Sequence, residues 1–157
     1  MTDAGFDEAM MRLALDHAVQ AREKGNTPVA AVIAKDGAML AVGQNEVRSG
    51  GDCTAHAEVV ALRKALAEFG AERVEGATCY TTMEPCPMCA WALVEGGIAR
   101  VVLGARHRQL GRKAYGAYAL EGLYELTGRE VAVTTGVLAE ECGEMRLAWM
   151  RQVGRES

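Results

Sequence analysis

The chain has 157 residues, of which 50% are apolar and 24% are charged, a composition typical of globular proteins and not of disordered ones. This length predicts one domain, residues 1–157, with a core large enough to need no disulfides. The formal net charge of −4 argues against an obligate nucleic-acid-binding protein, which usually carries a basic face.

The first third of the chain predicts a helix followed by a β-hairpin. In residues 6–24, apolar side chains recur at spacings of three and four, the pattern of an amphipathic helix, and Gly25 and Asn26 end it. Two short apolar runs, 29–34 and 39–42, flank a Lys-Asp-Gly turn and predict an antiparallel pair of strands.

The rest of the chain alternates between helices and strands. Residues 56–69 predict a helix that Gly70 ends, and the segment 104–128 predicts only a short helix near 118–123. The other expected elements are strands at 78–82, 100–103 and 130–134, and helices at 85–94 and 138–150. This alternation predicts an α/β fold with a partly antiparallel sheet, and it leaves the strand order open.

Three residues, His56, Cys86 and Cys89, have the types and spacing of metal ligands. They lie in the segments H-A-E and P-C-P-M-C, thirty positions apart. The five cysteines are an odd number, and a C-x-x-C pair with a histidine indicates metal binding rather than a disulfide framework. Three ligands without a fourth are typical of catalytic zinc, which keeps a position open for water. Glu58, between the ligands in the chain, is then the candidate proton carrier.

Two alternatives use the same residues. A structural zinc module would need a fourth ligand, which Cys53 or Cys79 would supply only through fortuitous placement. A dithiol redox site is disfavoured, because the C-x-x-C pair already has a metal partner in His56.

The chain resembles the zinc-dependent cytidine and nucleobase deaminase superfamily over roughly residues 6–150. The H-x-E and P-C-x-x-C motifs carry this resemblance, together with P-V-A-A-V-I at 28–33, G-Q-N at 43–45 and V-V-L-G-A at 101–105. The most similar branch holds guanine deaminases and bacterial tRNA adenosine deaminases. The resemblance implies a three-layer α/β/α sandwich with a five-stranded mixed sheet, one catalytic Zn²⁺ per subunit and a homodimer or higher oligomer.

The resemblance also implies roles for three residues. Glu58 would move protons during hydrolysis, although a regular helix would place it on a different side from His56, two positions earlier. Asn45 follows the second strand, where Asn also favours turns, and its amide would contact the substrate ring. The backbone N–H of Ala57 is a second expected substrate contact.

Three positions depart from the family's common pattern. Ala31 stands where glycine is frequent, Cys53 where a proline often precedes the histidine motif, and Trp91 where small residues are usual. None is a metal ligand, so the departures bear on pocket width and subunit packing.

The expected substrate is a small amino-heterocycle, a nucleobase, a nucleoside or a related amino ring, with guanine-like rings favoured and cytosine-like rings next. The acidic net charge supports such a small substrate. The alternative is a tRNA adenosine deaminase, which flips an anticodon base into the same pocket. Such an enzyme needs a basic groove, and residues 100–113 with Arg146, Arg151 and Arg155 would have to supply it. A solvated basic loop is the simpler interpretation of residues 100–113.

The remaining histidines and cysteines have weaker assignments. His17 lies on the apolar side of the first helix and is expected to be packed or partly exposed, and His107 is expected near the mouth of the site. Cys53, Cys79 and Cys142 are expected to be small buried hydrophobic residues.

Neither an export signal nor a membrane span is expected. Charged residues interrupt the first helix, and no apolar run approaches the roughly 20 residues of a membrane helix. With the odd cysteine count, this predicts the reducing cytoplasm. The apolar helix at 85–94, with Trp91 and Leu93, adds to the expectation of an oligomer.

Overall fold

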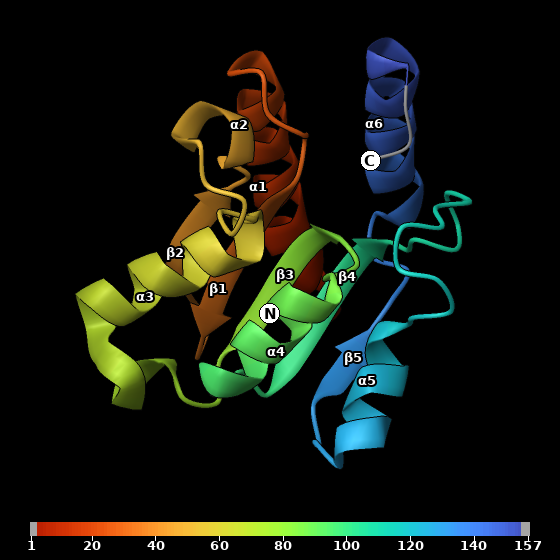
Figure 1. Ribbon diagram of the computed structural model, residues 1–157. Helices are drawn as coiled ribbons and strands as arrows, with labels where there is room; N and C mark the ends of the chain where they lie inside the picture. The colour runs from red at the N-terminus through yellow and green to blue at the C-terminus, as the bar shows by residue number, and fades with distance from the viewer. Residues whose placement is uncertain (1–2, 155–157) are drawn as a thin grey trace.

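The structure is a computed structural model that describes residues 3–154. A five-stranded sheet in the order β2-β1-β3-β4-β5 runs through the molecule, and helices cover it (Figure 1). The strands are β1 (Ala30–Lys35), β2 (Ala38–Gln44), β3 (Thr78–Met83), β4 (Arg100–Ala105) and β5 (Ala132–Thr134). The helices are α1 (Asp3–Glu23), α2 (Val47–Gly50), α3 (Ala57–Val74), α4 (Pro87–Glu95), α5 (Leu120–Thr127) and α6 (Ala139–Val153).

The sheet is mixed, as predicted. Strand β1 pairs antiparallel with both β2 and β3, whereas β4 is parallel to both β3 and β5. Strands β1, β3 and β4 are buried along almost their whole length. This burial explains why β1 and β4 are mostly apolar runs rather than alternating sequences, whereas β3 also contains three threonines.

Helices lie on both faces of the sheet and complete the predicted three-layer sandwich. In Figure 1, α3, α4 and α5 lie in front of the sheet and α1 lies behind it. Arg100 and Gly104 point to the same side of β4, because side chains alternate along a strand. Arg100 bonds Asp7 of α1, and Gly104 lies against Cys142 of α6. Helices α1 and α6 therefore cover the same face.

Several element boundaries differ from the prediction. Gly70 does not end its helix: with φ of +81° it kinks α3, which continues to Val74. The sequence does not predict α2, because none of its residues is buried and no apolar period marks it. Strand β5 has three residues instead of spanning 130–134, and the short helix α5 begins at Leu120.

A close approach between β2 and α3 positions the site. A Cβ on Gly43 would collide with the backbone of Ala57 and Ala61, so glycine is required where the helix crosses the strand. This contact fixes the first turn of α3, which carries Glu58 and directly follows His56.

Between residues 3 and 154, no helix combines the length and the hydrophobicity that crossing a membrane requires.

Candidate metal centre

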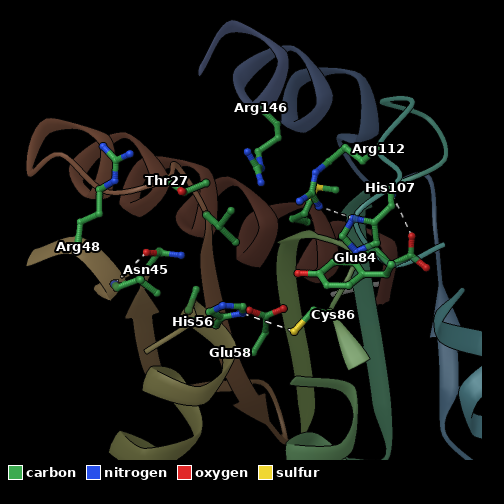
Figure 2. A pocket seen from close by; sticks show the side chains of 15 residues that line it. Thr27, Asn45, Arg48, His56, Glu58, Glu84, Cys86, His107, Arg112 and Arg146 are labelled. Atoms are coloured by element: carbon green, nitrogen blue, oxygen red, sulfur yellow. Dashed lines mark hydrogen bonds between the residues drawn. The ribbon is translucent and has the colours of Figure 1, made fainter. Parts of the chain in front are cut away.

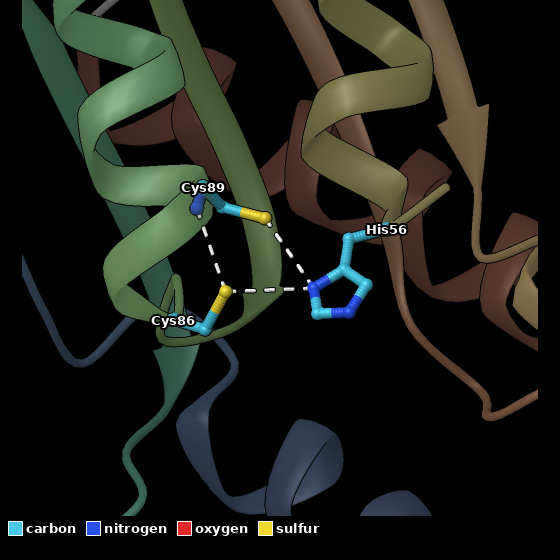
Figure 3. Close-up of side chains that lie close together, drawn as sticks. All are labelled: His56, Cys86 and Cys89. Atoms are coloured by element: carbon cyan, nitrogen blue, oxygen red, sulfur yellow. Dashed lines mark hydrogen bonds between the residues drawn. The ribbon is translucent and has the colours of Figure 1, made fainter. Parts of the chain in front are cut away.

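The three predicted ligands come together from two helix starts. His56 directly precedes α3, Cys86 directly precedes α4, and Cys89 lies in the first turn of α4. Their ligand atoms lie within 4.8 Å of one another, and Figure 3 shows all three side chains pointing to one centre.

The distances in this cluster fit tetrahedral zinc. His56 Nδ1 lies 3.5 Å from Cys86 Sγ and 3.5 Å from Cys89 Sγ. Zn–S bonds of about 2.3 Å and a Zn–N bond of about 2.0–2.1 Å at the tetrahedral angle separate sulfur from nitrogen by about 3.6 Å. The cluster can therefore hold Zn²⁺ through His56 Nδ1 and two sulfurs.

The start of α4 favours a thiolate at Cys86. The Cys89 backbone N–H donates to Cys86 Sγ at 3.4 Å, as expected where helix N–H groups have no intrahelical partner. Hydrogen bonds from the Cys89 side chain and then from His56 lower the pKa of Cys86 to about 4. The interaction with Cys86, and then burial, raise the pKa of Cys89. Metal binding would displace the proton that Cys89 keeps.

Glu58 lies beside the ligands but is not one of them (Figure 2). Its side chain is 4% exposed. Burial, and then the negative charge of Cys86, raise the pKa of Glu58 to about 7. A carboxyl group with such a pKa can take up and return a proton near neutral pH.

A cavity of about 210 Å³ opens over this cluster. His56, Ala57, Glu58 and Cys86 line it together, whereas Cys89 is fully buried behind them. Two of the metal ligands, the Glu58 carboxyl group and the predicted backbone contact at Ala57 therefore face one space.

Asn45 both holds a turn and lines the cavity, the two roles that the sequence suggests for it. Its Oδ1 accepts a hydrogen bond from the Val47 backbone N–H at 3.1 Å, which holds the turn before α2. The half-buried side chain also lines the cavity, so its amide nitrogen remains available to a ligand.

Buried Glu84 connects the metal centre to the segment that follows β4. Its carboxylate accepts hydrogen bonds from the backbone N–H groups of His107 at 3.0 Å and Leu120 at 2.9 Å. The sequence alone indicates no role for Glu84, because its partners lie 23 and 36 positions away. Its place directly before the P-C-P-M-C segment is the one signal that could have indicated it.

Two tyrosines of the segment 104–128 also connect this segment to the start of α4 and its first turns, through hydroxyl hydrogen bonds. Tyr118 donates its hydroxyl hydrogen bond to the Pro85 carbonyl at 2.7 Å, and Tyr124 donates to the Ala90 carbonyl at 2.9 Å. This segment therefore packs against the helix that carries the cysteines.

His107 lines the cavity, near the expected mouth, but it is buried. Arg112 Nη1 lies 2.7 Å from His107 Nδ1, which makes Nδ1 the acceptor because a guanidinium only donates. Burial, and then the charge of Arg112, lower the pKa of His107 to about 4. The imidazole is therefore neutral at neutral pH.

The other cysteine and histidine predictions are mostly confirmed. Cys79 and Cys142 are buried, but Cys53 is exposed, so the prediction of a buried residue there is wrong. Cys53 lies in a loop between α2 and α3 that faces solvent. His17 is half-buried, and its Nδ1 lies 3.0 Å from Gln44 Nε2.

The basic stretch 100–113 is neither one solvated loop nor one patch. Arg100 is held by Asp7 at 2.6 Å, and Arg106 pairs with Glu84 and Glu121. Arg112 is buried at the cavity. The stretch therefore divides between structural ion pairs and the pocket.

Of the two α4 residues expected to support an oligomer, only Trp91 is partly exposed. Leu93 is fully buried within the chain, and Trp91 is half-buried with the guanidinium of Arg129 5.3 Å from its ring centre. The homodimer or higher oligomer stays a prediction.

A mixed five-stranded sheet that carries a histidine, two cysteines and a buried glutamate around an open cavity defines a zinc-dependent deaminase. The chain belongs to this family: residues 5–105 match the cytidine and deoxycytidylate deaminase zinc-binding region. It is an enzyme that hydrolyses an exocyclic C–N bond, with zinc as its cofactor.

Deaminases of two kinds are among the proteins similar to this chain. The tRNA-specific adenosine deaminase of Bacillus subtilis is 37% identical over 150 residues, which are 96% of this chain and 92% of the relative. A solved tRNA:A34 deaminase, which edits the wobble position of transfer RNA, superposes with a TM-score of 0.76 and 34% identity over 87% of this chain and 98% of its own. A guanine deaminase from Nitrosomonas europaea superposes with a TM-score of 0.78 and 27% identity, over 90% of this chain and 83% of its own.

Proposed function

We propose that this enzyme deaminates adenosine in transfer RNA, converting it to inosine with release of ammonia. The supporting observation is the 37% identity to a tRNA-specific adenosine deaminase over 96% of the chain, compared with 27% to the guanine deaminase. The preference for a small-molecule substrate over tRNA, which the acidic net charge suggested, is not supported. Net charge sums the whole surface, whereas RNA responds to the charges around the pocket.

The cavity size is consistent with a substrate that enters only in part. At about 210 Å³, it is smaller than the roughly 300–1,000 Å³ of pockets that enclose a whole drug-sized ligand. An extruded base would fit inside while the rest of an RNA loop stays outside.

Each residue of the pocket has a proposed task. His56, Cys86 and Cys89 would hold zinc, which when bound lowers the pKa of water towards about 7. Glu58 would accept the proton of the attacking water and return it to the ring nitrogen and the leaving amine. The amide of Asn45 and the backbone N–H of Ala57 would orient the ring by hydrogen bonds.

A second candidate is deamination of a free guanine-like base. The observation that favours it is the fold similarity to the guanine deaminase, with a TM-score of 0.78 over 90% of this chain. The two candidates place different groups outside the pocket, an RNA loop in one case and solvent in the other.

One assay separates these candidates. We would measure ammonia release by the zinc-loaded protein from guanine, guanosine, adenine, adenosine, cytosine and an anticodon stem-loop with adenosine at the wobble position. We expect turnover of the stem-loop, with inosine as the product. Turnover of guanine together with an inert stem-loop would replace the proposal by the second candidate.

RNA binding gives an independent check. Affinity for the stem-loop should fall steeply with rising salt, because each neutralised phosphate releases counterions. Absence of binding at low salt would contradict the tRNA proposal whatever the turnover of free bases.

A further inference from the structure

Two buried arginines from distant segments line the mouth of the cavity. Arg112 follows β4 and is 9% exposed, and Arg146 belongs to α6 and is 6% exposed. Both line the cavity, and Figure 2 shows both side chains directed into the space above His56 and Glu58. Neither has a part in the proposed proton transfer.

The surroundings of Arg112 do not compensate its charge. Within residues 3–154, no salt bridge involves Arg112, and its Nε has no hydrogen-bond partner. Its Nη1 contacts the neutral His107, and its guanidinium lies 5.7 Å from the ring centre of Tyr115. Burying a cation without a carboxylate is unfavourable, so a ligand that brings negative charge would complete the site.

The second arginine increases the demand for an anion. Burial, and then the charge of Arg112, lower the pKa of Arg146 to about 10, so the two guanidinium groups repel each other while both stay charged at neutral pH. The acids that line the cavity do not offset the charge of Arg112: Glu84 is bonded to backbone N–H groups and Arg106, and Glu58 lies at the metal cluster.

We propose that Arg112 and Arg146 together bind a phosphate group that the substrate carries next to the reacting nucleoside. Two converging guanidinium forks match the charge and the several acceptor oxygens of a phosphate. The ring would lie at the zinc end and the phosphate at the mouth. The inference deepens the proposed function, and the phosphate has two sources: the 5′-phosphate of a mononucleotide or the backbone of RNA.

The test compares substrates with and without this phosphate. We would measure kcat and KM for adenosine, AMP, guanosine, GMP and the anticodon stem-loop with wild-type enzyme and with Arg112→Gln and Arg146→Gln. The matched control is Arg108→Gln, since Arg108 is an exposed cation of the same loop. Circular dichroism and Tm would verify folding, and Arg112→Lys keeps the charge without the fork should Arg112→Gln not fold.

We expect a phosphate to raise kcat/KM at least tenfold over the nucleoside. Either glutamine variant should raise KM for the phosphate-bearing substrate at least tenfold and change kcat/KM for the nucleoside less than twofold, whereas the control changes neither. Arg112→Lys should fall between wild type and Arg112→Gln. A gain seen with AMP or GMP identifies a mononucleotide, and a gain confined to the stem-loop identifies the RNA backbone.

Equal losses on the nucleoside and on the phosphate-bearing substrate would overturn the inference, because they indicate a structural role. Failure of the proposed function looks different: wild-type enzyme would then leave the anticodon stem-loop unreacted. In that case, calorimetric titration of AMP and inorganic phosphate still decides the inference. Binding weakened at least tenfold in Arg112→Gln supports it, and unchanged binding refutes it.

Discussion

Glu58 and His56 are two positions apart, but the metal cluster includes only His56. The imidazole lies outside the first turn of α3 and faces the two sulfurs, whereas Glu58 lies inside that turn and is buried at the cavity. A regular helix would place two residues at this spacing on different sides. Because His56 precedes the helix, its imidazole and the Glu58 carboxyl group can line the same cavity, one as a metal ligand and the other as a proton carrier.

We therefore predict that Glu58→Ala keeps zinc and the fold but loses turnover by a factor of about 100 to 10,000, the range for a general acid–base group. Zinc content by elemental analysis, Tm and kcat would be measured together. Glu68→Ala is the matched control, since Glu68 is an exposed glutamate of the same helix. Activity within tenfold of wild type in Glu58→Ala would exclude the proton-carrier role.

At the scale of elements, the metal joins α3 to α4. His56 belongs to the start of one helix and the two cysteines to the start of the other, so bound zinc adds a cross-link to the folded state.

Removal of zinc by a chelator should lower Tm by more than about 5 °C, since 1 kcal/mol shifts Tm by roughly 2–4 °C in a protein of this size. Added zinc should restore Tm in wild type and in Glu58→Ala. Cys89→Ala should bind zinc weakly and show no shift. An unchanged Tm after complete removal of zinc would show that the metal does not stabilise the contact between the helices.

The crossing of β2 and α3 gives a prediction about glycine. A side chain at Gly43 would collide with the backbone of Ala57 and Ala61, so Gly43→Ala should reduce the free energy of unfolding by about 1–3 kcal/mol, the usual effect of overpacking.

The control is Gly122→Ala. Gly122 lies within α5 with open space around it, so alanine there should stabilise the protein by about 0.5–1 kcal/mol. Urea denaturation measures both variants. Equal stability of Gly43→Ala and wild type would mean that α3 can move away from β2 without loss.

Elements with an apolar period could be predicted from the sequence, and elements without one could not. The hairpin of β1 and β2 and the buried strand β4 follow from runs of apolar residues, and β3 follows from a short run of residues that favour strands. Helix α2 has no buried residue, and Gly70 kinks a helix instead of ending it. The segment after β4 is held by hydrogen bonds to Glu84, Pro85 and Ala90. These partners are distant in the sequence, so the local pattern of residues in the segment could not predict its structure.

The candidate site also has a part that the sequence predicts, the metal ligands, and a part that it does not, the buried arginines. Zinc requires particular residue types at short spacings, so His56, Cys86 and Cys89 could be identified from the sequence alone. Arg112 and Arg146 could be named only as possible parts of a basic groove, because arginine is usually exposed and only the fold shows that these two are buried over the same cavity.

At the scale of the whole molecule, Asp7 connects the first helix to the centre of the sheet. Arg100 of β4, 93 positions away, donates to Oδ1 at 2.9 Å and to Oδ2 at 2.6 Å, and the Tyr80 hydroxyl donates to Oδ1 at 3.0 Å. Asp7 is 4% exposed. Burial alone would raise the pKa of Asp7, but the hydrogen bonds from Arg100 and Tyr80 outweigh burial and lower it below the ordinary value of 3.8.

A depressed pKa in the folded state has a definite consequence for stability. The stabilisation is complete above the ordinary pKa of 3.8, and it disappears as the pH falls through the lower folded-state value. Asp7→Asn should therefore reduce the free energy of unfolding at pH 7 by about 1–3 kcal/mol, as expected for hydrogen bonds to charged groups. Urea titrations from neutral pH to below 3.8 should show the two stability curves converging. The control is Asp16→Asn, at an exposed position of α1, which should follow wild type at every pH. If the stability difference between Asp7→Asn and wild type stayed constant down to the lowest pH, ionisation of Asp7 would not stabilise the fold.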